Sequence, residues 1–342
     1  MKTRTFLAFV APSLAMMIVF IALPLVSVFW QSFYNTQRVF HEVKVETCTP
    51  GFSRQICTTE LRHEASVDAN GKPITRTSFV GLESYRLVLQ PEAVMDGLKD
   101  GWAGFLRILD IDFYRALRFT LTFTFVTLPF VIGFGLLIAL MVNNAQRRLR
   151  GPIIFVSLLP YIITPVIGAL SIRWLFVSDG ILTVALSQLL GRQVSMFAHG
   201  WTIELLMLFY RIWHVVPFAF VVFYAGLQTV DQDTLESAIV DGASRYERLV
   251  HVVLPHLAPL IVFVSLIHLM DAYRVFEEVI GFSSQAHRIS LQWLTFNYLS
   301  PDQAGNRSIS RASASAMLTI IGVAFILAPL LKRTWRDHRR GV

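Results

Sequence analysis

The sequence has 342 residues, of which 54% are hydrophobic and only 15% are charged, and its formal net charge is +7. Charged residues make up about a quarter of an average soluble domain, so this composition excludes an ordinary soluble protein. The basic residues do not form one patch, as nucleic-acid binding would require, but lie beside apolar runs, which is how membrane topology is encoded. Nucleotide hydrolysis through a P-loop is also excluded, because Gly71-Lys72 is followed by Pro73 and no GxxxxGK[ST] motif occurs.

Six apolar segments are long enough to cross a bilayer as helices, which takes about 20 residues each. Four of them contain no charged residue. They are residues 6–30, 119–142, 152–172 and 312–331. The other two, about 201–227 and about 257–275, are interrupted by polar residues. Backbone groups in lipid must be hydrogen-bonded within the structure, so segments of this length are predicted to be helices. We therefore expect an all-α integral membrane protein with six transmembrane helices.

The first span, 6–30, is predicted to remain in the protein as an anchor. Its apolar run is longer than that of a secretory signal peptide, and no clear small-residue cleavage site is present.

The positions of Lys and Arg predict the orientation, because short cytoplasmic segments are enriched in these residues. On one side they are Lys2, Arg4, Arg147, Arg148, Arg150, Arg245, Arg248, Lys332, Arg333, Arg336, Arg339 and Arg340. The opposite short loops hold fewer, namely Arg192, Arg288, Arg307 and Arg311. Both termini and the segment 236–255 are therefore predicted to be cytoplasmic.

The long loop 31–115 is then predicted to be extracytoplasmic. It contains the two cysteines of the chain, Cys48 and Cys57, which flank a turn signal at Pro50-Gly51. An oxidising compartment favours a disulfide between them, and two free or buried thiols are the alternative. The alternating residues 43–47 and the neighbouring threonines suggest a small β-hairpin in this insert.

Polar groups inside the fourth and fifth spans are the candidate site. Charged side chains at membrane depth usually face a protein interior or a cavity. At 1.5 Å per residue, Arg211 and Asp271 can pair if their helices adjoin, and the competing pair is Asp271–Arg274. One interpretation is structural, with these groups satisfying one another; the other is a polar translocation path. The candidate path residues are Tyr210, Arg211, Trp213, His214, Tyr224, His268, Asp271 and Tyr273. No metal-binding or catalytic constellation is recognised.

Residues 236–255, between these two spans, have the pattern of two short helices. Apolar residues recur at helical spacing on both sides of Gly242. They are Leu235, Ala238 and Ile239 before it, and Tyr246, Leu249, Val250 and Val253 after it. Glycine weakens a helix interior and permits a turn, so Gly242 is predicted to separate the two helices. Pro255 then marks the junction with the next span. An ordinary amphipathic interfacial loop is the alternative.

This segment resembles the EAA loop of ABC-importer permeases, whose pattern is E-A-A, three residues, G, nine residues, I, one residue and L-P. Glu236-Ser237-Ala238, Gly242 and Leu254-Pro255 stand at the same spacing, with Ser237 in place of Ala and Val252 in place of Ile. The resemblance implies that this segment forms coupling helices that dock on a cytoplasmic ATPase. The residues assigned to this contact are Glu236, Ser237, Ala238, Asp241, Gly242, Ala243, Tyr246, Leu254 and Pro255.

Other stretches resemble carbohydrate-uptake permeases, especially the MalF-like member of the pair. They are SFVGLESYRLVL at 78–89, FYRALRFTLTFTFV at 113–126, WHVVPFAFVVFYAGLQTVDQDTLESA at 213–238 and MDAYRVFEEV at 270–279. The sequence departs from that family at Val230-Asp231, where Ile-Pro is usual, and after Val279, where Gly-Gly-Pro is usual. The insert at about 36–76 is not explained by the resemblance.

The resemblance implies a non-catalytic permease subunit in the bacterial inner membrane, with no cofactor of its own. Its partners would be an ATPase dimer that uses ATP and Mg, a second permease, and an extracytoplasmic binding protein that delivers a sugar or related compound. The chain would comprise an anchor helix 1–30, an extracytoplasmic loop 31–115, a permease core 116–335 and a cytoplasmic tail 336–342. A permease for a non-carbohydrate solute and a secondary transporter are the alternatives.

Overall fold

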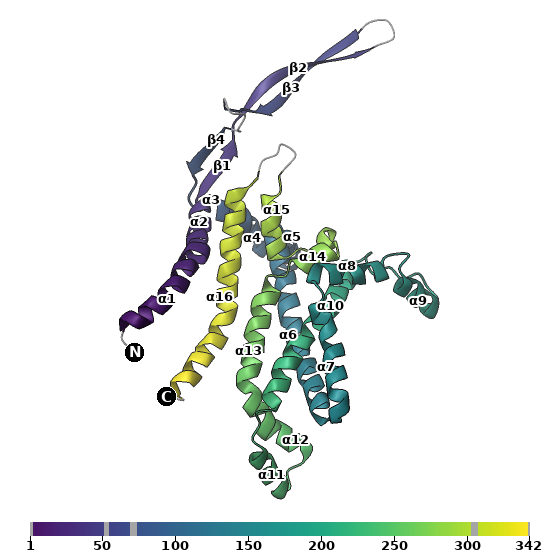
Figure 1. The fold of residues 1–342 in the computed structure, drawn as a ribbon. Helices are drawn as coiled ribbons and strands as arrows, with labels where there is room; N and C mark the ends of the chain where they lie inside the picture. The colour runs from purple at the N-terminus through teal and green to yellow at the C-terminus, as the bar shows by residue number, and fades with distance from the viewer. Residues whose placement is uncertain (1–2, 51–54, 69–73, 302–306, 341–342) are drawn as a thin grey trace. The chain divides into compact units, whose positions relative to one another are not determined.

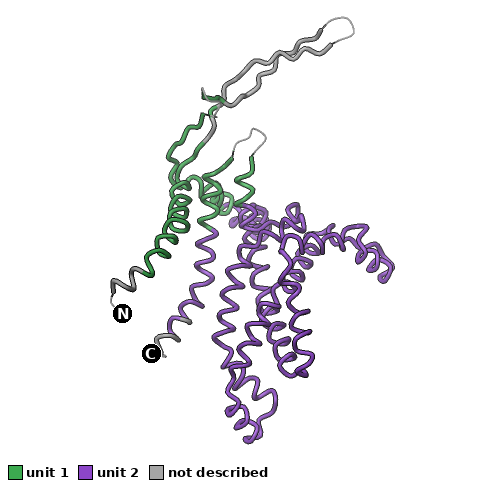
Figure 2. The backbone as a smooth tube through the Cα atoms, viewed as in Figure 1, with its two compact units in different colours: residues 1–95, 295–318 green, residues 96–294, 319–342 purple. Residues whose placement is uncertain are grey.

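The computed structural model describes residues 3–50, 55–68, 74–301 and 307–340 (Figure 1). The chain forms two compact units (Figure 2), residues 1–95 with 295–318 and residues 96–294 with 319–342. The described residues include six helices that are long and apolar enough to cross a membrane. They are Phe9–Gln31, Asp112–Asn144, Pro165–Leu190, Gly200–Leu227, Arg245–Tyr273 and Ile309–Arg333. The predicted membrane fold with six spans is therefore confirmed.

The first unit begins with three consecutive helical segments. It consists of α1 (Thr3–Met17), a π-helical turn η1 (Ile18–Ala22) and α2 (Leu23–Gln31). At its end the Ser32 hydroxyl lies 2.9 Å from that of Tyr85, on α3 (Glu83–Leu89). The unit also contains part of α4 (Pro91–Lys99), of α15 (Leu291–Leu299) and of α16 (Ile309–Arg340).

The predicted hairpin is present as part of two antiparallel ribbons. β1 (Tyr34–Arg38) pairs with β4 (Thr75–Phe79), and β2 (Phe40–Pro50) pairs with β3 (Gln55–Ala65). The register sets Cys48 directly opposite Cys57. Cα atoms of such opposite residues are about 4.5–5.5 Å apart, which suits a disulfide. The side chains of both cysteines lie outside the part of the chain that the structure describes, so the disulfide stays a prediction.

The second unit holds a bundle of long helices. Its elements in chain order are α5 (Gly101–Asp110), α6 (Asp112–Asn144), α7 (Arg147–Ile162), α8 (Pro165–Phe176), α9 (Ile181–Leu190), α10 (Gly200–Leu227), α11 (Gln232–Val240), α12 (Arg245–Arg248), η2 (Leu249–Val253), α13 (Leu254–Tyr273), α14 (Glu277–Gly281) and η3 (Ser284–Ala286). In Figure 1, α6, α7, α10 and α13 run side by side, and α11 and α12 lie at one end of them.

The core of this bundle lies where α6 meets α10 and α13. Gly135 permits a close approach of α6 to α10, because a Cβ built there would lie 2.6 Å from the Cβ of Ala219 on α10. Apolar side chains fill the interface on both sides of this contact. They include Phe119, Phe123, Val131, Val216, Phe220 and Leu257, all of them buried. Without a hydrophobic force between helices in lipid, such close packing is what holds membrane helices together.

The third span differs from its prediction. Residues 152–172 were expected to form one helix, but α7 ends at Ile162 and α8 begins at Pro165. Proline disfavours the helical conformation in the residue before it, and Thr164 accordingly has φ −58° and ψ 132°. The single helix 152–172 is therefore wrong, and the span-length candidate in this region is Pro165–Leu190.

Candidate functional site

A cavity of about 330 Å³ lies among α7, α8, α10, α13 and the start of α14. Its polar lining combines residues from helices that are far apart in the sequence. The main lining side chains are Tyr161, Arg211, His214, His268, Asp271 and Glu277. Four of the eight predicted path residues are among them, namely Arg211, His214, His268 and Asp271. The cavity also includes Tyr161 and Glu277, which the sequence did not single out.

Arg211 is the central charge of the cavity wall. One guanidinium nitrogen, Nη2, donates to a carboxylate oxygen of Asp271, and Nη1 donates to Oε1 of Glu278 over 2.9 Å. The Arg211 side chain is 5% exposed, the Glu278 side chain 0% and the Asp271 side chain 56%. A buried charge is tolerated when it is paired and hydrogen-bonded, so these contacts explain why α10 can carry an arginine at this depth.

Of the two pairs weighed from the sequence, the structure forms Arg211–Asp271. Arg274 instead donates from Nε to the carbonyl of Met270 over 3.3 Å. The second partner, Glu278, was missed because it lies beyond the predicted end of the fifth span. It returns to the bundle on α14, where Gly281 approaches Ala169 of α8 so closely that a Cβ would lie 2.6 Å from the Ala169 Cβ.

His268 presents a ring nitrogen without a partner. The Thr127 hydroxyl lies 2.7 Å from the carbonyl of Phe123, which it can donate to, and 2.8 Å from His268 Nε2. Because the hydroxyl has one proton, Nε2 is then the donor to Thr127, and Nδ1 of the neutral ring is left as an acceptor. Nδ1 is buried and has no hydrogen-bond partner among the described residues, although His268 lines the cavity.

His214 is fixed by the break between α7 and α8. Because α7 ends at Ile162, the carbonyl of Pro160 has no helical N–H to bond, and the His214 Nδ1 lies 2.8 Å from it as the donor. The ring of Tyr161 lies 5.9 Å from the His214 ring, centroid to centroid, and 47% of Tyr161 is exposed. An aromatic face is therefore available beside two histidines.

The four remaining predicted path residues do not line the cavity. Tyr210 is buried behind it, with its hydroxyl donating to the Pro165 carbonyl over 2.7 Å. Tyr273 is buried with its hydroxyl against Gly322 of α16, whereas Tyr224 is partly buried and its ring lies 6.0 Å from that of Phe220 on the same helix. Tyr210 and Tyr273 therefore pack helices together. Trp213 is also absent from the lining.

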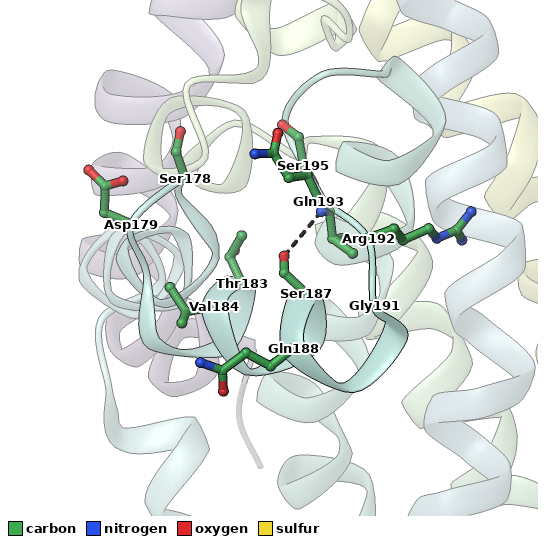
Figure 3. A pocket seen from close by; sticks show the side chains of 11 residues that line it. Ser178, Asp179, Thr183, Val184, Ser187, Gln188, Gly191, Arg192, Gln193 and Ser195 are labelled. Atoms are coloured by element: carbon green, nitrogen blue, oxygen red, sulfur yellow. Dashed lines mark hydrogen bonds between the residues drawn. The ribbon is translucent and has the colours of Figure 1, made fainter.

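A wider hollow, of about 720 Å³, lies between the α8–α9 turn and residues 191–195 (Figure 3). The amide of Val194 donates to the Ser187 hydroxyl over 3.1 Å and ties this loop to α9. In Figure 3 the charged side chains Asp179 and Arg192 extend away from the hollow in opposite directions. Its charged groups therefore do not converge on one point, in contrast to those of the cavity around Arg211.

The segment between α10 and α13 is a helix, a tight turn and a second helix. α11 ends in a Schellman motif, in which Ala243 N donates to Ala238 O over 2.9 Å and Gly242 N donates to Ile239 O over 3.0 Å. Gly242 has φ +80°, a conformation that other residues rarely adopt. The turn therefore depends on glycine at this position.

Both short helices are capped by their own side chains. Asp231 caps α11, and hydrogen bonds from the Thr234 hydroxyl and the Asp233 amide hold the pKa of Asp231 below its ordinary value. Ser244 and Glu247 form a capping box at the start of α12. These caps satisfy backbone amides at the start of each helix.

The apolar residues of this segment are largely uncovered. Val240 is 87% exposed, Tyr246 is 73% exposed and Ile239 is 53% exposed. Leu235 and Ala238, from the same predicted face, are not buried either. Beyond α12 the chain passes through the π-helical turn η2 directly into α13, with Pro255 in its first turn. The exposed pair of helices is thus continuous with a spanning helix.

The chain matches the family described as "Binding-protein-dependent transport system inner membrane component" over residues 112–336. It belongs to this family. It is therefore a permease of the ABC-importer type and a multi-pass protein of the inner membrane. The matched range covers the cavity and the α11–α12 segment and leaves out the β-strand insert.

Relatives of this permease agree with that assignment. It is 28% identical over 265 residues to the trehalose/maltose transport system permease protein MalF of Thermococcus litoralis, covering 76% of this chain and 86% of that protein. It is 26% identical over 249 residues to the arabinooligosaccharides transport system permease protein AraP of Halalkalibacterium halodurans, covering 71% and 77%.

The fold has a counterpart among solved structures. A chain of a bacterial ABC transporter involved in the import of the acidic polysaccharide alginate superposes with a TM-score of 0.67, over 98% of this chain and 96% of that chain. The two are 18% identical, so this likeness concerns the fold.

Proposed function

We propose that this permease forms half of the translocation path of an ATP-driven importer for a sugar, oligosaccharide, glycoside or polyol. The observation that carries the proposal is the polar cavity at membrane depth, because charged groups in a span are costly, and those that line a cavity often mark the pathway of a substrate. The names of the trehalose/maltose and arabinooligosaccharide permeases, to which the chain is similar, support a carbohydrate cargo.

The chemistry of the cavity suits a sugar. A sugar is held by hydrogen bonds to its hydroxyl groups and by aromatic rings against its C–H faces. The partly exposed Asp271 carboxylate can accept a hydrogen bond from a hydroxyl, and the unpartnered Nδ1 of His268, which is buried in this structure, would accept another once the cavity opens. The exposed ring of Tyr161 supplies the apolar contact. The eight predicted path residues thus divide into four that would meet cargo and four that lie outside the cavity.

The proposed partners are an ATPase dimer in the cytoplasm, a second permease and an extracytoplasmic binding protein. The ATPase would bind ATP and Mg and catalyse hydrolysis, whereas this chain would bind no cofactor and catalyse no reaction. The termini and the α11–α12 segment would lie in the cytoplasm. Residues Glu236, Ser237, Ala238, Asp241, Gly242, Ala243, Tyr246, Leu254 and Pro255 would form or support the contact with the ATPase.

Coupling would follow from the continuity of α12, η2 and α13. When the ATPase dimer closes, it would displace the α11–α12 segment, whose exposed Val240 and Tyr246 would supply the contact. Because α13 continues from this segment, the displacement would reach His268 and Asp271 near its far end. The ion pairs of Arg211 would transmit it to α10 and α14, and so change access to the cavity.

The test is purification of the tagged permease from its own membranes in a mild detergent, followed by mass spectrometry of the proteins that accompany it. The proposal predicts an ABC ATPase and a second, different permease. A Val240→Glu/Tyr246→Glu variant is the matched control and should lose the ATPase while it retains the second permease. Recovery of this chain alone, under conditions that preserve a known importer, would contradict the proposal.

The nature of the cargo is tested separately, by uptake of a panel of labelled solutes into vesicles that contain the purified complex and its binding protein. Uptake of a neutral sugar or polyol supports the carbohydrate assignment. Uptake restricted to an amino acid or another non-carbohydrate solute would favour the alternative cargo and leave the transporter class intact.

A further inference from the structure

The short helix α5 has three sides of different character. One side is packed against α4, where Gly104 lies so close to Gly97 that a Cβ on Gly104 would be 1.8 Å from the Gly97 carbonyl oxygen. Ile108, one turn further along, is also buried in this contact. This side is therefore occupied by the chain itself.

The second side of α5 is polar. It carries Asp100 just before the helix, then Arg107 and Asp110, at helical spacing. Arg107 forms an ion pair with Asp100, and the side chains of both are more than half exposed. An exposed ion pair of this kind belongs at a surface that water can reach.

The third side of α5 is apolar and uncovered. Trp102 is 74% exposed, Phe105 is 43% exposed and Leu106 is 47% exposed. The rings of Trp102 and Phe105 stack with their centroids 5.5 Å apart. Leu98, at the end of α4, adds a further apolar side chain and is 67% exposed. We call these four residues the Trp102 face.

The place of α5 in the fold indicates what covers the Trp102 face. α5 ends at Asp110, and the spanning helix α6 begins two residues later at Asp112. Figure 1 shows α5 beside the first turns of α6, at the end of the bundle opposite the α11–α12 segment. The first turns of α6 carry Asp112, Arg115 and Arg118 and precede the apolar stretch 119–142, so α5 lies beside the polar end of this span.

Helices with this division of faces lie in the membrane interface, with the apolar side about 5–10 Å deep in the boundary between headgroups and acyl chains. Tryptophan is enriched at that level because its ring is apolar and its N–H is polar. We propose that α5 is an interfacial helix whose Trp102 face is embedded in the leaflet at which α6 begins. In this position it fixes the depth and the direction of the first turns of α6. The proposal depends on the membrane-spanning character of α6 and not on the cargo of the importer.

The lipid assignment is preferred to a protein partner because α5 is joined directly to α6, a spanning helix with exposed apolar side chains of its own. Farther along that helix Phe125, Phe130 and Phe134 are 45–49% exposed, as expected of side chains that face acyl chains. The polar side of α5, with Arg107 and Asp110, would then face the aqueous phase.

The test is a set of single spin labels on the full chain, reconstituted in a phospholipid bilayer with the subunits that co-purify. Cys48 and Cys57 are first replaced by serine, and cysteine is then introduced one position at a time. Labels at 102, 105 and 106 report the Trp102 face, labels at 107 and 110 report the polar side, and a label at 130 is the reference within the bilayer. The ratio of collision rates with oxygen and with a water-soluble nickel chelate measures exposure to lipid or to water.

The proposal predicts a ratio at 102, 105 and 106 that lies between the low value at 107 and 110 and the high value at 130. A ratio at the Trp102 face equal to that at 107 would place the face in water and overturn the proposal. Low collision rates with both reagents would show that a protein covers it, which would also overturn the proposal. Because three positions report the same face, loss of folding in one variant leaves the test intact.

Discussion

The ion pairs of Arg211 predict an unequal response when either carboxylate is neutralised. Glu278 is fully buried and its oxygen lies 2.9 Å from Arg211 Nη1, whereas the Asp271 side chain is 56% exposed. Breaking a buried pair by removing one partner costs about 3–5 kcal/mol, because it leaves an uncompensated charge. An exposed pair contributes about 0–1 kcal/mol. Glu278→Gln should therefore lower the free energy of unfolding by several times more than Asp271→Asn.

Steric trapping of the purified chain in detergent micelles measures this difference, because it reports the unfolding equilibrium of a membrane protein without heating. A loss of about 3–5 kcal/mol corresponds to a shift of roughly two to nearly four orders of magnitude in the unfolding constant. The double variant Arg211→Met/Glu278→Gln is the control, and should be less destabilised than Glu278→Gln alone, because in the single variant the buried Arg211 keeps only the largely exposed carboxylate of Asp271 as its partner. Equal losses for Glu278→Gln and Asp271→Asn, or a greater loss in the double variant, would refute this reasoning.

Three further predictions concern the turn, the core and the insert. Gly242→Val should leave the chain in the membrane but abolish ATP-coupled uptake, because φ is +80° there, and Gly242→Asn should retain more uptake since asparagine tolerates this conformation. Uptake by Gly242→Val at the normal rate would count against the coupling role. Gly135→Leu should lower the free energy of unfolding by about 1–3 kcal/mol, because the new side chain overpacks against α10. Gly133→Ala should be nearly neutral, because a Cβ at this position meets nothing within 4 Å. Steric trapping measures the free energy of unfolding of both variants. Intact-mass analysis with thiol alkylation before reduction should find Cys48 and Cys57 unmodified, and alkylation of both would exclude the disulfide.

The spans were predictable because hydropathy is summed over about 20 residues, so single errors cancel. The break between α7 and α8 at Ile163 and Thr164 was not predictable in this way. Pro152 and Pro160 lie inside α7 without ending it, yet Pro165 starts a new helix. The sequence alone does not show which proline interrupts a helix, because an interruption requires hydrogen-bond partners for the backbone carbonyls that it frees. Here His214 supplies one of them, and it comes from another helix.

The candidate site was predictable only in part, because the sequence does not show how distant segments pack. The depth of a residue along its helix follows from the rise per residue, and this was enough to indicate the Arg211–Asp271 pair. Glu278 required knowledge of how α14 folds back on α8, which depends on the close contact of Gly281 with Ala169. Tyrosines such as Tyr210 are of a residue type that binds sugars, but this one is buried among helices. Residue type therefore indicated candidates, and packing decided which of them face the cavity.

The turn between α11 and α12 was the most predictable part of the molecule. Its geometry is local, and Gly242 was enough to indicate it; the capping box of Ser244 and Glu247 is equally local but was not singled out from the sequence. Local hydrogen bonds need no distant partner, so spacing in the sequence is enough to indicate them.

The proposed function is tested most directly by uptake of a labelled sugar into vesicles that contain this permease with its co-purified subunits and binding protein. Uptake should require ATP on the side of the membrane that the ATPase faces. It should be lost in Gly242→Val, and it should be reduced in His268→Phe without loss of complex assembly. Uptake that continues without ATP, or that is unchanged in both variants, would contradict the proposed function.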